Sequence, residues 1–511
     1  MFYKNLNPAE AVSGDELEAG KRALVWDAAW ASLTGAWSGG VVLVAFALSL
    51  GAGPMTIGLL AAIPFMAQAA QLPTIFLVER IRRRKLIGVT SLNIARAIIF
   101  LLALLPFAAP ASWRIPLLLL SQVGIALMGS VAACAINSWF HQMLPPTGLG
   151  AFFGRRLLIA SALACGGTLA AGLLVDHPPF GVANYAYAAS FAAAALAGFA
   201  SSACLARTPE PVMPVAGPAM PLRDMLREPL GDGNFRHLVL MLGGWNLASN
   251  LAAPFFTVYL IQQLGFSLST VTTLWVTSQL SNAAALYLWG QLSDRLSNKA
   301  ILAVALPTYF LSTLGLVFAD VSRSEDVQLL LLYLLHIFMG MASGGISLAT
   351  GNLGLKLAPQ GKGTSYLALI GLVSAVAGGV APIAGGAIAE GLSDNQLSVL
   401  VRWMSSSSSQ EMAVLAFAHW EFLFALSALM GLYVMHALSR IQEGDEISER
   451  VVIQELGLEA LRTVNHLSTI GGVLGSVFTF DRVAERRRQA RRWLQGATAM
   501  PPRPNRDRRQ G

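Results

Sequence analysis

The sequence predicts an all-α integral membrane protein with twelve transmembrane helices, arranged as two related halves of six helices each. Composition is the first observation, because 55% of the 511 residues are hydrophobic and only 12% are charged, whereas soluble domains carry about 25% charged residues. The second is a series of twelve apolar stretches, each long enough for the roughly 20 residues that a spanning helix needs. The third is an internal repeat, in which short motifs recur after 213 to 215 residues.

The predicted helices are joined by short connections. Turns at 51–54 and 265–267 separate the first helix from the second and the seventh from the eighth. Residues 1–22 hold too many charged side chains for a cleavable signal peptide, so we expect the first helix to be an uncleaved anchor. The twelve stretches lie near residues 23–49, 54–78, 86–109, 115–139, 152–175, 183–206, 235–263, 268–291, 299–319, 328–352, 364–390 and 416–439.

Lysine and arginine gather in the loops that follow the even-numbered helices. Residues 80–85 alone hold five of them, whereas the opposite loops offer only Arg114, Arg323 and Arg402. Cytoplasmic loops carry such an excess, so both termini are predicted to lie in the cytoplasm. The Ala- and Arg-rich composition favours a bacterial source, and therefore the inner (plasma) membrane. The net charge of +7 follows mainly from this asymmetry and from a basic tail, so it does not indicate nucleic acid as a partner.

The repeat defines the predicted organisation of the chain. Asp294 follows Glu79 by 215 residues, and Glu390 follows Asp176 by 214. Both halves begin on the same side of the membrane, so the axis that relates them runs along the membrane normal. The predicted parts are a cytoplasmic segment at 1–22, an N-terminal half at 23–206, a proline-rich cytoplasmic linker at 207–234, a C-terminal half at 235–440 and a basic tail at 441–511. The tail either lies on the anionic inner leaflet or stays solvated and partly disordered.

Two basic turns occupy equivalent places in the halves, at residues 79–84 and 290–299. The second, Gly290-x-Leu292-x-Asp294-Arg295-x-x-Asn298-Lys299, resembles the loop signature of the major facilitator superfamily. It lies between the eighth and ninth helices, where that family has its second copy. The first copy departs from the pattern, with Ile75 in place of glycine and Glu79 in place of aspartate.

The resemblance implies a gating latch that stabilises the outward-facing state. A carboxylate at a helix end can face the positive N-terminus of a neighbouring helix, and it can also pair with nearby arginines. The alternative is that the basic residues only fix the topology and contact anionic lipid. The predicted latch residues are Glu79, Arg80, Arg83, Arg84, Gly290, Asp294, Arg295 and Lys299.

A glycine-rich stretch in the eleventh helix resembles the GPxxGG-type helix motif of the same family. Its predicted packing residues are Gly378, Pro382, Gly385 and Gly386, because small residues let transmembrane helices approach closely. That motif is best known from the fifth helix of drug/proton antiporters. Here the fifth helix lacks proline and the fourth has Gln122 in place of the usual arginine, so the drug-antiporter subclass is not favoured.

Polar residues within the predicted spans are the candidates for a substrate or proton site, since ionisable groups in the bilayer are costly. Asp27 could bind a cationic group, carry a proton, or pair with Arg155 or Arg156. Arg96 could hold an anionic group or pair with an acid. Other candidates either line a cavity, as the resemblance implies for the first, seventh and eighth helices, or join helices to one another. These are Trp30, Trp245, Asn246, Asn250 and Gln279.

The predicted function is secondary active transport of a small solute by alternating access, coupled to protons as a symporter or antiporter. We expect a monomer in a lipid bilayer, with no cofactor and no metal. The alternatives are a transporter-shaped assembly or scaffold protein without transport, and a drug or metabolite exporter of the antiporter type. The sequence contains no HExxH, GxSxG or Walker A motif, so no catalytic motif supports an enzyme.

Overall fold

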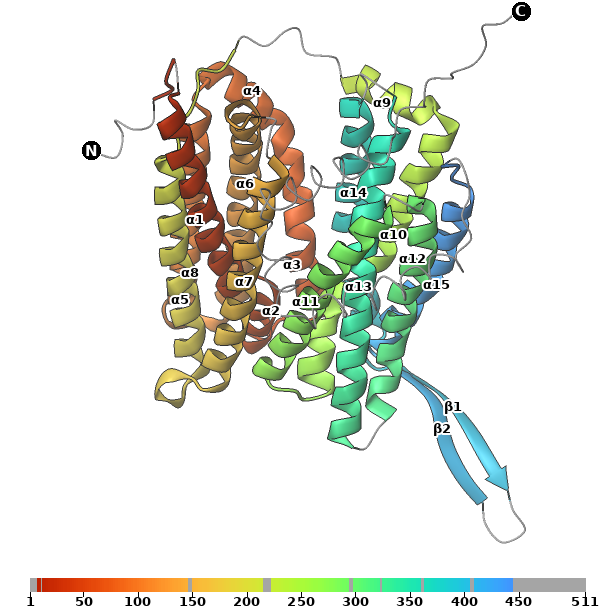
Figure 1. Cartoon of the computed structure of the whole chain (residues 1–511). Helices are drawn as coiled ribbons and strands as arrows, with labels where there is room; N and C mark the ends of the chain where they lie inside the picture. The colour runs from red at the N-terminus through yellow and green to blue at the C-terminus, as the bar shows by residue number, and fades with distance from the viewer. Residues whose placement is uncertain are drawn as a thin grey trace, which may run out of the picture. The chain divides into compact units, whose positions relative to one another are not determined.

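The computed structural model describes residues 7–443, apart from residues 11, 146–148, 215–221, 294–296, 322–323, 360–362 and 405–408. The N-terminal half is helical throughout (Figure 1). Its first helix is broken in two at Gly39–Gly40, where Gly40 has a φ of +50°. The helices are α1 (Gly14–Ser38), α2 (Gly40–Ser49), α3 (Pro54–Ala67), η2 (Gln68–Ala70), α4 (Gln71–Ile81), α5 (Arg84–Ala108), α6 (Ala111–Met143), α7 (Leu149–Asp176), η3 (Pro179–Gly181) and α8 (Ala183–Ala206).

The C-terminal half repeats this plan after a short linker helix, α9 (Leu222–Gly231). Its helices are α10 (Gly233–Val258), η4 (Tyr259–Gln263), α11 (Leu268–Ser293), α12 (Asn298–Gly315), η5 (Leu316–Val321), α13 (Glu325–Leu357), α14 (Gly363–Gly391) and α15 (Glu421–Ser439). Among the described residues, eleven helices are long and apolar enough to cross a membrane. The 26-residue α11 takes the place of the eighth spanning helix, which confirms the predicted fold class of two six-helix halves.

The packing within the halves follows the repeat. In the N-terminal half α1 packs against α7 and α8, α5 against α6 and α8, and α3 against α6. The equivalent helices pair in the C-terminal half, where α10 packs against α14 and α15, α12 against α13 and α15, and α11 against α13. The turns before α3 and α11 are also alike, since Gly51 and Gly265 both have a left-handed φ, of +87° and +71°. Glycine adopts this conformation without the penalty that other residues meet.

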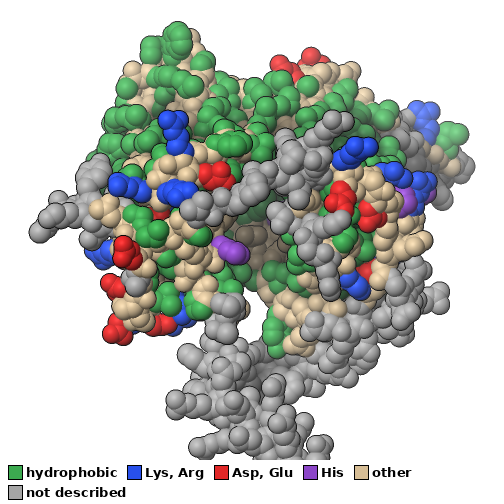
Figure 2. Space-filling model, turned by 90° about the horizontal axis from the view of Figure 1, so that it is seen from above, with side chains coloured by type: hydrophobic (Ala, Val, Ile, Leu, Met, Phe, Trp, Pro, Cys, Tyr) green, Lys and Arg blue, Asp and Glu red, His purple; other side chains and the backbone are tan. Residues whose placement is uncertain are grey.

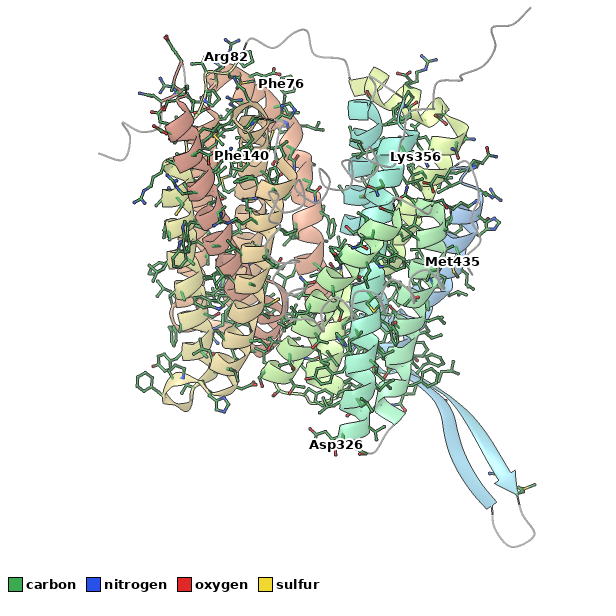
Figure 3. All side chains as sticks on the ribbon, in the orientation of Figure 1. Phe76, Arg82, Phe140, Asp326, Lys356 and Met435 are labelled. Carbon is green, nitrogen blue, oxygen red and sulfur yellow. The ribbon has the colours of Figure 1, made fainter. Side chains whose placement is uncertain are left out.

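The two ends of the helical bundle differ, and we name them by residues labelled in Figure 3. Arg82 lies at one end and Asp326 at the other (Figure 3). Two helices of the N-terminal half pack against the C-terminal half, α3 against α14 and α7 against α11, and α2 contacts α10 and α11. The ribbons of the two halves meet toward the Asp326 end and stand apart toward the Arg82 end (Figure 1).

A β-hairpin follows α14, between the eleventh and twelfth predicted spans. Its second strand takes up residues 416–418, which were predicted to begin the twelfth span, and α15 begins only at Glu421. The strands are β1 (Gln396–Met404) and β2 (Ser409–Ala418), which pair antiparallel with Gln396 opposite Ala418. The hairpin extends beyond the helices at the Asp326 end (Figure 1). Valine and tryptophan favour extended structure, but a short run of apolar residues does not by itself distinguish a strand from a buried helix segment.

The outer surface of the bundle is apolar. Many large hydrophobic side chains are more than half exposed, among them Phe76, Trp113, Leu120 and Leu196. Such a surface is expected of helices whose solvent is lipid, where only fully hydrogen-bonded backbone is tolerated. Lysine and arginine side chains gather instead on the face at the Arg82 end, around a hollow between the two halves (Figure 2).

Candidate functional site

A cavity of about 360 Å³ lies in the C-terminal half between α10, α13 and α14. Two of the predicted site residues, Trp245 and Asn246, line it from adjacent positions on α10. The remaining lining residues are apolar, small or hydroxyl-bearing. They are Leu242, Ser343, Ile346, Ser347, Thr350, Gly351, Gly354, Leu367, Ile370 and Ser374.

The polar groups of this cavity are positioned by short hydrogen bonds. Asn246 Nδ2 donates to the carbonyl oxygen of Leu242 at 2.9 Å and to Ser374 Oγ, across on α14, at 3.3 Å. Thr350 Oγ1 donates to the carbonyl oxygen of Ile346 at 2.6 Å, which leaves the lone pairs of its oxygen available. The amide of Asn246 is therefore held between two helices, with its Oδ1 atom remaining as an acceptor.

The structure does not bring the other two predicted site residues of the C-terminal half to the cavity. Asn250 lies one turn further along α10, and its Nδ2 donates to the carbonyl oxygen of Asn246 at 2.9 Å. Gln279 is exposed on α11. Neither is among the residues that line the cavity.

Asp27 lies in a separate polar cluster inside the N-terminal half. The residue is 7% exposed, and its carboxylate accepts hydrogen bonds from Ser201 Oγ on α8 at 2.8 Å and from Arg156 on α7 at 3.4 Å. Arg156 also donates to the carbonyl oxygen of Leu24 at 3.2 Å. Of the two arginine partners that the sequence offered, the structure selects Arg156.

Arg96 belongs to the same cluster. Its side chain crosses from α5 to α8, where it packs directly on Gly198, so that a Cβ atom there would overlap the arginine stem. It is close enough to Asp27 for an electrostatic interaction. Trp30, one turn after Asp27, is 37% exposed and takes no part in these hydrogen bonds. The cluster therefore holds one carboxylate and two guanidinium groups, Arg96 and Arg156.

At the Arg82 end, Arg84 is bound to the linker. It is 2% exposed, and Glu210 Oε1 accepts from its backbone N–H at 2.7 Å and from its Nε at 3.4 Å. The guanidinium also donates to the carbonyl oxygen of Pro211 at 2.8 Å and to Gln142 Oε1 at 2.6 Å. Burial raises the pKa of Glu210 by more than the hydrogen bonds from Arg84 and Lys85 lower it, so its pKa lies above the ordinary carboxyl range.

An equivalent contact occurs in the C-terminal half. Glu443, just after the last helix, accepts from the backbone N–H of Lys299 at 2.6 Å, from Asn298 Nδ2 at 2.7 Å and from Lys356 Nζ at 3.2 Å. Burial acts to raise the pKa of Glu443, but these hydrogen bonds outweigh it, so its pKa lies below the ordinary range. In each half a carboxylate that follows the sixth helix thus caps the N-terminus of the third.

These contacts place the predicted latch residues as follows. Arg84 binds Glu210 of the linker, and Lys299 binds Glu443 just after the last helix. Arg80 and Arg83 are exposed, Glu79 is half-buried, and Gly290 has open space around its Cα. Asp294 and Arg295 lie outside the described residues, so the latch stays a prediction. Glu210 and Glu443 were not among the predicted site residues, although Glu210 stands in the distinctive run Pro209-Glu210-Pro211.

Toward the Asp326 end, Asp176 joins the two halves. Its carboxylate, at the end of α7, accepts from the backbone N–H of Leu268 at 3.0 Å and of Ser269 at 2.7 Å, at the start of α11. Gly172, one turn earlier, lies so close to Thr272 and Ser269 that a Cβ atom would overlap the threonine side chain. A negative charge at a helix N-terminus is favourable, so the contact is both electrostatic and steric.

The second contact between the halves is made by glycines of α3 and α14. A Cβ atom at Gly58 would overlap the carbonyl oxygen of Pro382, and one at Gly386 would lie 2.8 Å from the carbonyl oxygen of Pro54. Gly378 packs on the ring of Phe65, at 2.5 Å from an added Cβ. Gly385 instead faces α10, against the carbonyl oxygen of Leu251. All four predicted packing positions of α14 thus lie at close helix–helix contacts.

Two related six-helix halves in a membrane, with a largely apolar cavity that holds a few hydroxyl and amide groups in one of them, match the architecture of membrane transporters. The sequence agrees, since the sequence model of the Major Facilitator Superfamily matches residues 26–382. The chain belongs to this family of membrane transporters, whose members carry small-molecule solutes. A comparison with curated proteins gave no match.

Solved structures with the same fold include several transporters. A mutant of the nucleoside transporter NupG has a TM-score of 0.61 at 14% identity, over 82% of this chain and 99% of that chain. A bacterial homologue of the iron transporter ferroportin in the inward-facing state has a TM-score of 0.60 at 14% identity, over 83% and 98%. A POT family transporter in complex with a thioalcohol-conjugated peptide has a TM-score of 0.58 at 11% identity, over 86% and 100%. At these identities the likeness concerns the fold.

Proposed function

We propose that the protein is a secondary active transporter that moves a small solute by alternating access. The observation that carries this proposal is the uneven distribution of contacts between the halves. The α3–α14 and α7–α11 contacts join the halves toward the Asp326 end. At the other end, among the described residues, Arg84 binds Glu210 of the linker and Lys299 binds Glu443 after the last helix, and neither hydrogen bond joins one six-helix half to the other. Such an arrangement leaves a path into the molecule from one side only.

The accessible side is proposed to be the cytoplasm. The face that surrounds the hollow in Figure 2 carries many lysine and arginine side chains, and an excess of these residues is typical of cytoplasmic loops. This conformation is then inward-facing, and both termini are cytoplasmic. The sequence-based assignment to a bacterial inner membrane remains part of this proposal.

Opening to the outside requires the α3–α14 and α7–α11 contacts at the Asp326 end, which we call the outer contacts, to separate. The hydrogen bonds of Asp176 to α11 and the glycine contacts of α3 with α14 would both be lost. In the outward-facing state the predicted latch, including Asp294, would close the cytoplasmic side. Glu210 and Glu443 would keep each half rigid during this movement, because their hydrogen bonds cap helices within the same half.

Asp27 is the proposed site of proton coupling. Protonation of its carboxylate would weaken its interaction with Arg156, which lies on α7, the helix that ends in Asp176. A change at Asp27 would therefore act on a helix that forms one of the outer contacts. The alternative role of Asp27, a fixed ion pair within the half, predicts transport without dependence on a pH gradient.

The test is solute flux in proteoliposomes with an imposed pH gradient. Vesicles would be loaded with a defined mixture of labelled sugars, nucleosides, amides and organic acids, and efflux would be followed by mass spectrometry. We expect gradient-driven flux for the native protein, exchange without accumulation for Asp27→Asn, and native behaviour for the control Glu18→Gln, an exposed carboxylate on the same helix. The absence of flux for every solute would refute the transport function and favour a scaffold role.

A further inference from the structure

We propose that the cavity between α10, α13 and α14 binds an uncharged polar solute of the size of one substituted ring. The inference rests on the proposed transport function and adds the substrate class to it. Three features of the cavity carry it: the charge of its lining, its hydrogen-bonding groups, and its size together with an aromatic lining residue.

The first feature is that every residue lining the cavity is neutral. The nearest lysine along α13, Lys356, lies two residues beyond the lining position Gly354, and its ammonium group is bound by Glu443 at 3.2 Å. In the N-terminal half, Asp27 and Arg156 bind one another. A charged group that leaves water for the cavity would meet no opposite charge among the lining residues, and burying an unpaired charge is costly.

The second feature is a set of hydroxyl and amide groups that can both donate and accept. Asn246 donates its two amide hydrogens to the carbonyl oxygen of Leu242 and to Ser374 Oγ, so its own oxygen remains as an acceptor for a ligand. Ser374 accepts from Asn246 and keeps its own hydroxyl hydrogen for donation. Thr350 offers lone pairs in the same cavity. A solute that carries hydroxyl or amide groups satisfies these positions, whereas a hydrocarbon leaves them unpaired.

The third feature is an aromatic lining residue of fixed orientation. The indole of Trp245 packs edge-on against Tyr309 and Phe310, with ring centroids 4.8 and 5.7 Å apart and interplanar angles of 72° and 74°. These contacts hold the ring that lines the cavity, and a planar solute can stack on such a surface. The volume of about 360 Å³ equals roughly twelve water molecules at ~30 Å³ each. It lies near the lower bound of small-molecule pockets, which favours a single ring over a peptide or a dinucleotide.

The experiment compares solutes of one shape that differ in charge. The probes are nicotinamide with nicotinate and 1-methylnicotinamide, and glucose with glucuronate and glucosamine. Flux into proteoliposomes and ligand-dependent shifts of the melting temperature are measured for each. We expect at least one neutral compound to move and to stabilise the protein at a concentration at least tenfold below that of its charged partners, since a bound ligand raises the melting temperature by mass action.

Variants connect this preference to the cavity. Asn246→Leu and Ser374→Ala are each expected to lower the affinity for the neutral ligand at least tenfold, because a polar group of the ligand that loses its hydrogen-bond partner is strongly disfavoured. Ser249→Ala is the matched control, since this serine donates to the carbonyl oxygen of Trp245 and lies outside the lining. Equal or stronger transport of the charged partners, or unchanged affinity in both variants, would overturn the substrate class while leaving transport intact. Failure of every probe to move, together with failure of the labelled mixture, would overturn the transport function itself.

Discussion

The contact of Asp176 with α11 gives the most direct test of how the outer side is held closed. The carboxylate accepts two backbone hydrogen bonds, at 3.0 and 2.7 Å, from the first turn of α11. A side chain that caps a helix N-terminus contributes about 1 kcal/mol, and its negative charge contributes about 1 kcal/mol more when partly buried. Asp176→Ala loses both terms, about 2 kcal/mol, whereas Asp176→Asn keeps one carbonyl acceptor and loses about 1 kcal/mol.

These free energies translate into populations of the two states. The hydrogen bonds exist only when α7 and α11 are together, so their loss favours the outward-facing state. At about 1.4 kcal/mol for each tenfold change, the ratio of outward- to inward-facing molecules should rise roughly fivefold for Asp176→Asn and about thirtyfold for Asp176→Ala. The control is Glu390→Gln, because Glu390 is the equivalent residue 214 positions later and is exposed.

The assay measures the distance between nitroxide labels on the outer side, in detergent and in nanodiscs. Labels would be attached through Phe180→Cys and Val327→Cys, two positions whose side chains are 91% and 55% exposed, after replacement of the native cysteines by serine. We expect a longer-distance population that grows in the order native, Asn, Ala. If both Asp176 variants keep the native distance distribution, the carboxylate does not hold the outer side closed.

Other consequences follow from the same contacts. Burial raises the pKa of Glu210. Its protonation therefore contributes stability that is fully present below the ordinary carboxyl pKa and is lost as the pH rises through the raised pKa. In thermal melts recorded against pH, Glu210→Gln should flatten this loss. The pKa of Glu443 is lowered, so its contribution to stability depends on pH in the opposite direction and is lost as the pH falls through that pKa. Glu443→Gln should flatten this loss. Arg82 has a left-handed φ of +55° at the end of α4, and Arg82→Gly should raise stability by about 1 kcal/mol, measured as a higher melting temperature. Gly58→Ala should increase the outward-facing population in the label assay, because the backbone of α14 cannot yield to a Cβ; Gly166→Ala, with nothing within 4 Å, is the matched control and should not.

The architecture was predictable because membrane helices leave strong local signals. Length and hydropathy identify a membrane-spanning helix whichever helices it packs against. The turns with Gly51 and Gly265 repeat at the spacing of the halves. The packing glycines of α14 were predictable for a related reason, since small residues in a span indicate close approach. The structure adds which helix each glycine meets: Gly386 faces α3, whereas its neighbour Gly385 faces α10.

The partners of the charged residues were less predictable. Arg84 meets Glu210 across 126 positions of sequence, and the basic turn itself gives no indication of which carboxylate it binds. The choice between Arg155 and Arg156 for Asp27 depended on the orientation of α7, which the apolar pattern of a helix surrounded by lipid and protein defines poorly. The β-hairpin was missed because its strands resemble other short apolar runs.

The outer contacts also show that a repeated fold does not give two identical gates. Asp176 lies at the end of α7 and Glu390 near the end of α14, and these two helices are equivalent in the repeat. The end of α7 lies next to the start of α11, and the end of α14 lies next to the start of α3. However, α11 begins with Leu268 and Ser269, whose free N–H groups bind the carboxylate, whereas α3 begins with Pro54, which has no N–H, and has no side-chain cap. The α7–α11 contact therefore combines hydrogen bonds to a carboxylate with glycine packing, whereas the α3–α14 contact is glycine packing. Salt screens charges exposed during opening but leaves van der Waals contacts unchanged, so ionic strength should alter the effect of Asp176→Asn and not that of Gly58→Ala.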